Sequence, residues 1–418
     1  MAKIKAFQAL RPNEKIAERV AALPYDVCSR SEAKKEIQRE PLSFLKIDRA
    51  ETQFDDTVDM YAKEVYQRAH DSLWDMVSDG SFIKDDKQCL YLYELTMNGR
   101  IQTGLVACSS VEDYLNDVIK KHENTLDFKL QDRIHHVDVC NAQTGPIFLA
   151  YRKNPKIAEY LIEAKENAPI FDFVSSDGIV HRGWKIEADE QIQKITEAFN
   201  GIEHTYIADG HHRAESAVRV SLKRKAEDKA DEKLERESDY FLSVLFSEEE
   251  LYIMDYNRIV KDLNGLTEAA FLSAVENICD VTLEVPYQNL ECEGHPKEKG
   301  HMRMYLAGRW YDLSIKEAYR SNDPVDGLDV SILQNEILHP ILGIENPKTD
   351  SRIQFVGGIR GLKEIEQRTD AEGGVAFVMY PTAMQELFQV ADAGKLMPPK
   401  STWFEPKLRS GLFIHVLD

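Results

Sequence analysis

The sequence has few of the features that mark secreted or membrane proteins. Its six cysteines are scattered and form no CxxC pair, which favours reduced and mostly buried thiols over disulfides or a zinc site. No apolar stretch approaches the length of a membrane-spanning helix, and Met1 to Leu10 lacks the apolar run of a signal peptide. We therefore expect a cytoplasmic protein that does not associate with membranes.

Basic residues are also fewer than acidic residues. The net charge is −20 and the sequence pI is near 5.1. A nucleic-acid-binding protein usually carries a basic surface, so we expect no nucleic-acid partner, although a local basic pocket can still bind a small anion. The hydrophobic share of 43% and the charged share of 30% are ordinary for a globular protein. A chain of 418 residues suggests two or three compact units.

The order of the expected elements indicates a mixed fold. Helical and strand-like patterns alternate irregularly, and Asn98-Gly99 and Ala307-Gly308 each separate two strand-like runs, as in a hairpin. We therefore expect an α+β or mixed α/β fold. We also expect a strand at 42–47, and a pair of strands at 241–246 and 251–260.

The most informative stretch lies between a short strand and a long helix. Residues 206–208 are typical of a buried strand, a helix is expected from about Arg213, and Asp209 and Gly210 form the turn between them. A turn of this kind presents backbone N–H groups and the positive end of a helix dipole to solvent. The pattern therefore predicts an anion site at Asp209 and Gly210.

Polar side chains add chemistry to this turn. Arg213 offers a planar fork to phosphate or carboxylate, and His211 and His212 precede it. Asp209 offers oxygen ligands to a divalent cation. The alternative is that Asp209 caps the helix and that the histidines are partly exposed polar residues. Four such residues at one junction favour a functional site.

A second polar cluster lies between two expected helices. Glu123 can act as a general base on a hydroxyl, if the hydroxyl comes within hydrogen-bond reach. Lys120, Lys121 and, in the helix expected at 126–140, Arg133 can hold phosphate. The alternative is a solvated charged loop at a helix end, which the residues by themselves favour.

Two further segments carry candidate residues. Tyr25 and Asp26 follow Pro24, where they either line a site or form a turn after a helix. Near the end of the chain, the run 397–407 has basic and hydroxyl side chains suited to phosphate or carboxylate contacts, and the alternative is a surface loop around a buried Trp403.

Two family resemblances are carried by these motifs. The Asp209-Gly210-His211-His212-Arg213 box resembles the DGHHR signature of the ParB/sulfiredoxin-like superfamily, in which it binds nucleotide phosphates. The archaeal free serine kinases carry the same box and phosphorylate free L-serine with ADP or ATP. The order of PYDV at 24–27, HENT at 122–125, DGHHR, and MPPKSTWFEPK at 397–407 resembles a bacterial family known as a domain of unknown function. Its members often occur beside serine-biosynthesis enzymes.

The resemblances imply a phosphotransferase that acts on free L-serine or O-phosphoserine, with ADP or ATP as co-substrate and Mg²⁺ or another divalent cation at Asp209. The HENT match favours Glu123 as the catalytic glutamate, while the segment around Glu14 resembles the one that carries it in the serine kinases. The implied catalytic residues are His122, Glu123, Asp209 and His211. The implied nucleotide and phosphate contacts are Gly210, His212, Arg213, Thr125, Arg133, Lys400, Ser401, Thr402 and Lys407.

The resemblances also suggest a division of the chain. We expect a ParB/sulfiredoxin-like catalytic region at 1–235, which contains the HENT and DGHHR motifs, and a C-terminal α+β region at 236–418. A homodimer is compatible with the sequence. Two other functions stay open: a phosphoserine phosphatase that needs no nucleotide, and a nucleotide-binding ParB-like protein without catalysis. A sulfiredoxin-like role is disfavoured, because His211 stands where that family uses cysteine.

Overall fold

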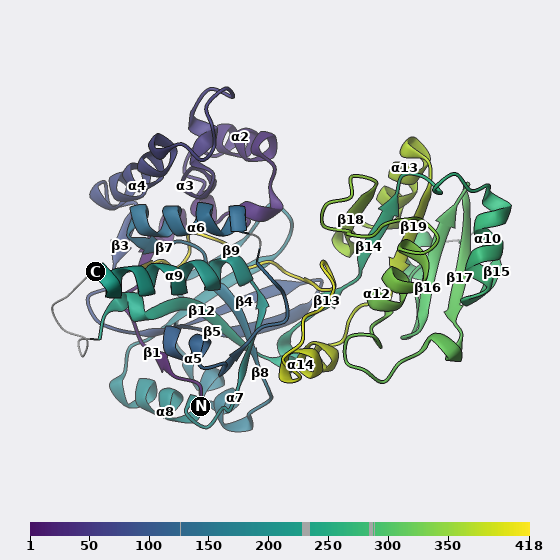
Figure 1. Ribbon diagram of the computed structural model, residues 1–418. Helices are drawn as coiled ribbons and strands as arrows, with labels where there is room; N and C mark the ends of the chain where they lie inside the picture. The colour runs from purple at the N-terminus through teal and green to yellow at the C-terminus, as the bar shows by residue number, and fades with distance from the viewer. Residues whose placement is uncertain (126, 228–234, 284–286, 288) are drawn as a thin grey trace. The chain divides into compact units, whose positions relative to one another are not determined.

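The chain forms two compact units. The computed structural model describes residues 1–125, 127–227, 235–283, 287 and 289–418. The first unit comprises Met1–Leu251 and Pro406–Asp418, and the second comprises Tyr252–Glu405 (Figure 1). The expected mixed α/β fold is confirmed. The sequence suggested a division after residue 235, whereas the chain leaves the first unit after Leu251 and returns to it at Pro406.

The first unit is built on a nine-stranded mixed sheet. Its strands follow the order β6-β11-β8-β12-β5-β4-β10-β9, and β1 pairs with β5. Two neighbouring pairs, β6 with β11 and β8 with β12, are parallel, and the other pairs are antiparallel. The strands are β1 (Ile4–Lys5), β4 (Leu90–Met97), β5 (Arg100–Ser110), β6 (Ile119–Lys120), β8 (Ile147–Tyr151), β9 (Phe171–Val174), β10 (Val180–Ile186), β11 (Thr205–Asp209) and β12 (Tyr240–Ser247).

Helices pack on this sheet and on one another. In Figure 1, α6 and α9 lie side by side with α4 beyond α6, and the same pairs are in contact. Ala214, Ala217 and Val218 of α9 join a buried core with strand residues such as Leu149 and Phe241. The helices of this unit are α1 (Ala17–Val20), α2 (Arg30–Arg39), α3 (Leu45–Asp48), α4 (Lys63–Ser78), α5 (Val111–Leu115), α6 (Asp127–Cys140), α7 (Pro155–Ala164), α8 (Asp189–Phe199) and α9 (His211–Glu227).

The last residues of the chain pair with other segments of the first unit. Strand β21 (His415–Val416) pairs with β7 (Ala142–Gln143), and Leu10 forms a bridge with Ile414. A further small sheet joins β2 (Leu10–Pro12) to β3 (Phe82–Lys84). Ile414 is fully buried, so the last residues belong to the core of this unit.

The second unit contains a six-stranded antiparallel sheet in the order β15-β17-β16-β19-β14-β18. Helix α13 packs on β14, β16 and β19, where Leu362 and Ile365 enter a buried core with Ile259 and Val378. Its strands are β13 (Ile253–Met254), β14 (Tyr256–Val260), β15 (Cys279–Leu283), β16 (His301–Leu306), β17 (Arg309–Ile315), β18 (Ile353–Gly357), β19 (Val375–Met379) and β20 (Trp403–Phe404). Its helices are α10 (Glu268–Glu276), α11 (Leu290–Glu293), α12 (Asp329–Ile332), α13 (Leu362–Glu372) and α14 (Met384–Asp392).

The structure confirms both hairpins and corrects two other expectations. Asn98, Gly99, Ala307 and Gly308 all have positive φ, as two-residue hairpin turns require. The strand expected at 42–47 is wrong, because the second half of this short apolar run lies in helix α3 and its spacing fits either structure.

The expected pairing of 241–246 with 251–260 is also wrong. Strand β12 already has β5 on one side and β8 on the other, so no edge is left for the next strand. Strand β14 pairs instead with β18 and β19 in the second unit.

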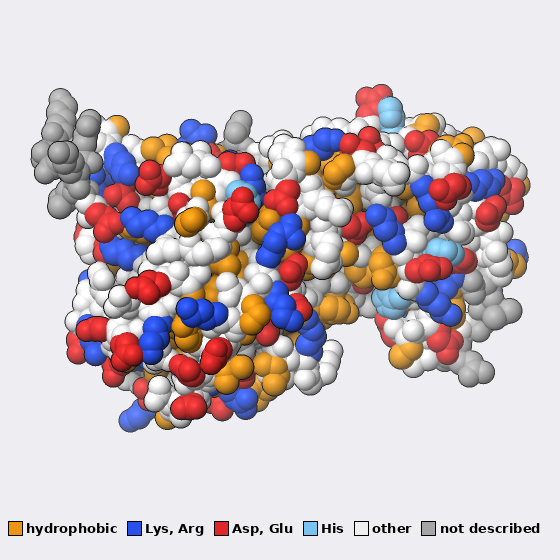
Figure 2. Space-filling view, turned by 90° about the horizontal axis from the view of Figure 1, so that it is seen from below, with side chains coloured by type: hydrophobic (Ala, Val, Ile, Leu, Met, Phe, Trp, Pro, Cys, Tyr) orange, Lys and Arg blue, Asp and Glu red, His pale blue; other side chains and the backbone are white. Residues whose placement is uncertain are grey.

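The surface carries both signs of charge. On the face in Figure 2, acidic and basic side chains are interspersed. In the residues that the structure describes, no helix is both long enough and apolar enough to cross a bilayer.

Candidate functional site

The turn between β11 and α9 has the geometry that its sequence predicts. The strand ends at Asp209, the helix begins at His211, and Gly210 between them has a φ of +96°. A Cβ atom at Gly210 would lie 3.1 Å from Nε and Nη2 of Arg213. Glycine therefore serves two needs here: it adopts a left-handed conformation, and it lets the guanidinium of Arg213 lie against the turn.

Asp209 forms an ion pair with a residue from the end of the chain. The Nζ atom of Lys407 lies 2.8 Å from Oδ2 of Asp209, and the two side chains are 11% and 27% exposed. Burial by itself would raise the pKa of the Asp209 carboxyl, but Lys407 and Arg213 outweigh it and hold that pKa well below its ordinary value. Asp209 is therefore an ionised carboxylate at neutral pH.

Two buried histidines meet beside this carboxylate. Strands β6 and β11 are parallel neighbours, with Lys120 opposite Tyr206, so the residues after their carboxyl ends lie together. The rings of His122 and His211 pack edge to face, with their centroids 4.5 Å apart. His122 is 2% exposed and His211 is 6% exposed.

Burial sets the charge of both imidazoles. It lowers the pKa of His122 to about 3 and the pKa of His211 to about 4, so both rings are neutral at neutral pH. Nδ1 of His122 and Nε2 of His211 are buried and have no hydrogen-bond partner among the described residues. Buried polar atoms are nearly always paired in folded proteins, so these two nitrogens mark a place for a ligand or solvent.

The HENT loop brings Glu123 to the same place. Glu123 is half-buried directly after His122, and the charges of Glu123 and Asp209 both act to raise the pKa of His122 against the larger effect of burial. Thr125 is half-buried in this loop. The other candidate glutamate, Glu14, is exposed at the start of a short 3-10 helix.

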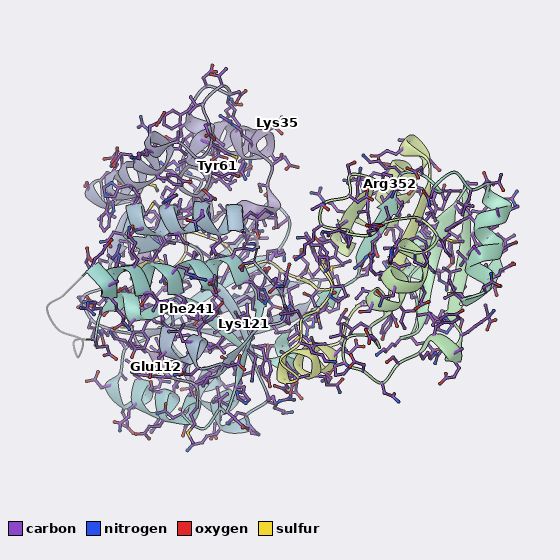
Figure 3. All side chains as sticks on the ribbon, in the orientation of Figure 1. Lys35, Tyr61, Glu112, Lys121, Phe241 and Arg352 are labelled. Atoms are coloured by element: carbon purple, nitrogen blue, oxygen red, sulfur yellow. The ribbon has the colours of Figure 1, made fainter. Side chains whose placement is uncertain are left out.

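The two lysines before the HENT loop have local partners. Lys120 forms an ion pair with Asp117 at 2.7 Å. The Nζ atom of Lys121, a residue labelled in Figure 3, lies 4.4 Å from the centre of the Tyr114 ring. A phosphate contact from either lysine would replace these interactions.

Arg213 points back from the helix toward the start of β8. Its Nη1 donates a hydrogen bond to the carbonyl of Pro146, and its side chain lies within 3.6 Å of the place that a Cβ atom on Gly145 would take. His212, the next basic residue of the box, is half-buried. The box thus presents one guanidinium and the first backbone N–H groups of a 17-residue helix at the end of β11.

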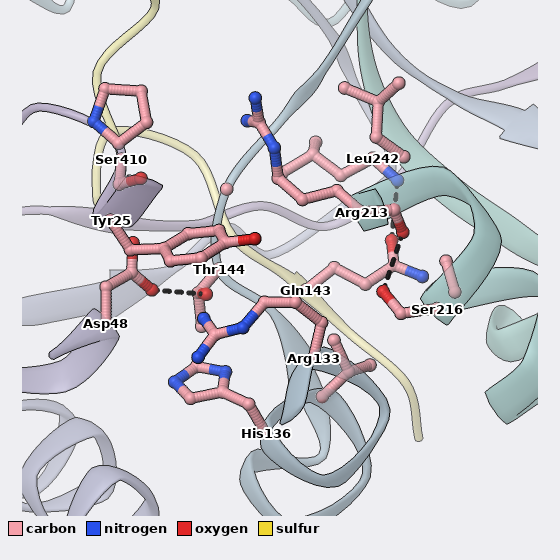
Figure 4. Close-up of a pocket in the computed structure, with 15 residues that line it drawn as sticks. Tyr25, Asp48, Arg133, His136, Gln143, Thr144, Arg213, Ser216, Leu242 and Ser410 are labelled. Atoms are coloured by element: carbon pink, nitrogen blue, oxygen red, sulfur yellow. Dashed lines mark hydrogen bonds between the residues drawn. The ribbon is translucent and has the colours of Figure 1, made fainter. Parts of the chain in front are cut away.

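A cavity lies beside Arg213, lined by residues of α6, α9, β8 and β12 and of the neighbouring loops. Figure 4 shows the inner part, where Arg133 lies against the ring of Tyr25 and Asp48 accepts a hydrogen bond from Thr144. The guanidinium carbon of Arg133 is 4.0 Å from the centre of the Tyr25 ring. The inner part is lined by Pro24, Tyr25, Asp48, Arg133, His136, Val137, Gln143, Thr144, Gly145, Ile147, Arg213, Ser216, Ala217, Leu242 and Ser410.

Some residues of this cavity have no motif in the sequence. Asp48 belongs to α3 and Thr144 precedes β8, and each stands among ordinary core residues along the chain. Tyr25 was a candidate, with a turn as the alternative, and it both starts a short 3-10 helix and lines the cavity.

The terminal motif is divided between the two units. Lys407 belongs to the first unit, whereas Lys400, Ser401 and Thr402 belong to the second. The hydroxyl of Ser401 donates to the carbonyl of Pro398 at 2.7 Å, and Lys400 is exposed. The structure therefore brings Lys407 to Asp209 and leaves the phosphate role of the other three residues a prediction.

The described residues contain no group of three or more His, Cys, Asp or Glu side chains that could hold a metal ion. Asp209 is thus a single carboxylate beside Lys407. Mg²⁺ is often held by one or two carboxylates together with the phosphates of a substrate. Asp209 fits that mode of binding, and the described residues add no set of protein ligands around it.

The fold and the site define a mixed α/β protein with a charged turn between a strand and a helix. The chain belongs to the DUF1015 family, described as a protein of unknown function, whose family model matches residues 4–331. The matched part contains the motifs at 24–27, 122–125 and 209–213 and ends before the motif at 397–407. The expected membership of a domain-of-unknown-function family is thereby confirmed.

Several solved structures are similar to the chain at low identity. A mutant free serine kinase in complex with AMP has 12% identity and a TM-score of 0.35, over 71% of this chain and 90% of that chain. SbnI with C-terminal truncation from Staphylococcus aureus has 12% identity and a TM-score of 0.39, over 74% of this chain and 87% of that chain. A conserved hypothetical protein from Pyrococcus furiosus has 15% identity and a TM-score of 0.34, over 72% and 93%. No curated protein matches the chain.

Proposed function

We propose that this protein transfers a phosphoryl group between a nucleotide, ADP or ATP, and the hydroxyl of free L-serine. The observation that carries the proposal is the pair of buried, neutral imidazoles beside the ionised Asp209, at the start of helix α9. Two imidazole nitrogens there lack a partner in the described protein, so a polar ligand is expected to supply one. Serine is chosen because the DGHHR box resembles that of the free serine kinases.

The turn has what a phosphate group needs. The first backbone N–H groups of α9 and the positive end of its dipole favour an anion, and Arg213 adds a planar fork at the same place. Lys407 adds a second cation through its ion pair with Asp209. Neutral His211 can donate one N–H bond to a phosphate oxygen without adding a charge.

The reaction needs one base and a place for the growing charge. The bond from the terminal phosphorus to its bridging oxygen breaks, a bond from phosphorus to the serine oxygen forms, and the hydroxyl proton passes to Glu123. Arg213 and Lys407 stabilise the charge that spreads over the transferred group. Glu123 is preferred over Glu14 because it lies beside the histidine pair.

A divalent cation fits this scheme as a companion of the nucleotide. Asp209 would hold Mg²⁺, and the ion would neutralise phosphate charge. Thr125, His212, Lys400, Ser401 and Thr402 remain predicted phosphate contacts. Arg133, also predicted to hold phosphate, lies in the cavity with Asp48 and is assigned below to another group.

The test measures transfer of labelled phosphate from ATP, and separately from ADP, to L-serine by the full-length protein. We expect Asp209→Asn and Glu123→Gln each to reduce the rate by at least ~100-fold, because each removes a carboxylate that acts on the reacting groups. Glu190→Gln is the control, since Glu190 is an exposed residue of α8 paired with Lys194. Normal transfer by both site variants would contradict the proposal, as would an absence of transfer from either donor by the wild type.

A further inference from the structure

The cavity beside Arg213 has two compartments with a shared wall. The inner one has a volume of about 30 Å³ and the outer one about 140 Å³. Tyr25, Asp48, Arg133 and His136 line both. Arg213 lines the inner compartment, so this cavity lies next to the turn at Gly210. The shared residues therefore lie next to the proposed site of phosphate transfer.

Arg133 supplies a buried positive charge and N–H donors that a ligand can use. The residue is 8% exposed, and its Nε and Nη2 atoms contact Oδ2 of Asp132 at 2.9 and 2.7 Å. Its guanidinium face lies on the Tyr25 ring. Nη1 has no hydrogen-bond partner in the part of the chain that the structure describes. Two N–H groups of a fixed, buried guanidinium are thus left for a ligand.

Asp48 supplies a buried carboxylate with one oxygen that a ligand can use. The residue is 4% exposed, and Oδ1 accepts a hydrogen bond from Thr144 at 2.8 Å. Oδ2 has no partner among the described residues, and no cation of this part of the chain forms an ion pair with Asp48. Asp48 lines the cavity, so this oxygen can accept a hydrogen bond from a cationic ligand group there.

The two opposite charges share the cavity without touching. Arg133 and Asp48, both in the described part of the chain, are not joined by an ion pair, although the charge of Asp48 helps to keep Arg133 protonated. A ligand with one charge of each sign, a few bonds apart, would satisfy both. A nucleotide phosphate would leave Asp48 unpaired and would be repelled by it.

We infer that this cavity binds a small free amino acid as its zwitterion, with Arg133 holding the α-carboxylate and Asp48 holding the α-ammonium. Its volume selects a small side chain. The inference that a zwitterion binds here rests on the residues of the cavity. The further inference that this zwitterion is the phosphoryl acceptor rests on the proposed function. In that role the side-chain hydroxyl points toward the compartment lined by Arg213.

The first test uses the wild-type protein and ligands that each lack one charge. Isothermal titration calorimetry is run with L-serine, L-serine amide and N-acetyl-L-serine, with and without ADP present. We expect L-serine to bind at least ~30-fold more tightly than either analogue, because each analogue leaves one buried charge unpaired. Equal binding of all three ligands, or binding of none, would overturn the inference.

The second test uses variants of the two charges. We expect Asp48→Asn and Arg133→Lys to weaken L-serine binding by at least ~30-fold and to leave ADP binding unchanged. Asp329→Asn is the matched control, since Asp329 is a buried aspartate of the second unit that accepts a backbone N–H bond. If a cavity variant does not fold, the analogue series decides.

The experiments distinguish a failure of the zwitterion site from a failure of the proposed phosphoryl transfer. L-serine binding that depends on Asp48 and Arg133, without phosphoryl transfer, would support the zwitterion site and contradict the kinase. Phosphoryl transfer with an unchanged KM for L-serine in both folded cavity variants would support the kinase and overturn the zwitterion site.

Discussion

Gly210 is the residue on which the shape of the candidate site most depends. Its φ of +96° is strained for any other residue, and a Cβ atom there would meet the guanidinium of Arg213 at 3.1 Å. We expect Gly210→Ala to lower the free energy of unfolding by ~1–2 kcal/mol and to weaken nucleotide binding at least ~10-fold, because Arg213 must move. Thermal unfolding and ADP titration measure the two effects.

Gly178→Ala is the control for this prediction. Gly178 also has a positive φ, of +80°, but a Cβ atom there would meet nothing within 4 Å. We expect a similar loss of stability and normal nucleotide binding. Equal loss of nucleotide binding in both variants would contradict the assigned role of Gly210.

Residues that are contiguous in the chain could be placed from the sequence, and residues joined over long distances could not. Asp209, Gly210 and Arg213 belong to one short motif, and the strand, turn and helix predicted for it are confirmed. The contact between Asp209 and Lys407 joins residues 198 positions apart. Asp48 has no recognisable motif, and its proposed role follows from its place in one cavity with Arg133, which depends on the packing of whole helices.

Among the elements, β21 depends on a buried acid–base cluster. His415 of this strand is 1% exposed, and its Nε2 lies 2.9 Å from Glu237, which also pairs with Lys5 at 2.9 Å. The hydrogen bond from His415 does most to lower the pKa of Glu237 to about 2, and burial lowers the pKa of His415 below 6.5. Both groups take up protons more readily in the unfolded chain.

Stability of the first unit is therefore expected to fall on acidification. The contribution of His415 declines as the pH falls below 6.5, and that of Glu237 declines between 4.5 and about 2. We expect Glu237→Gln to lower the free energy of unfolding by ~1–2 kcal/mol at neutral pH and to flatten its fall below pH 4.5. Urea unfolding over this pH range measures the free energy of unfolding. An acid dependence that is the same in the variant and the wild type would contradict the prediction.

Local turn chemistry explains which elements were predictable. The hairpin at Asn98-Gly99 follows from a dipeptide that tolerates positive φ, and the one at Ala307-Gly308 from a glycine between two strand-like runs, so their strands could be found from the sequence. The run 42–47 could not be assigned, because a short apolar segment suits a strand or a helix until its neighbours are known. The pairing of β14 could not be foreseen, since it depends on strands more than 90 residues further along the chain.

At the scale of the whole molecule, the second unit is an insertion into the first. Its two ends meet in a small sheet, where Ile253 pairs with Phe404 and Met254 with Trp403. It also has its own antiparallel sheet and buried core. We expect residues 252–405 expressed alone to unfold cooperatively on heating, as followed by circular dichroism.

The first unit is expected to behave differently when the chain is cut. Residues 406–418 supply β21 and the fully buried Ile414, so residues 1–251 without them lose a strand and part of the core. We expect that fragment to be insoluble or to unfold without a cooperative transition. A stable, cooperative fragment 1–251 would contradict the place given to the last residues.

The most direct test of the central claim is ³¹P NMR of the wild-type protein with two substrate mixtures. One tube contains L-serine with Mg²⁺ and ATP or ADP, and the other contains O-phospho-L-serine with Mg²⁺ and no nucleotide. We predict phosphoserine in the first tube, formed as the donor loses its terminal phosphate, and no inorganic phosphate in the second. Inorganic phosphate released from phosphoserine without nucleotide would identify a phosphatase and contradict the proposed phosphoryl transfer to serine.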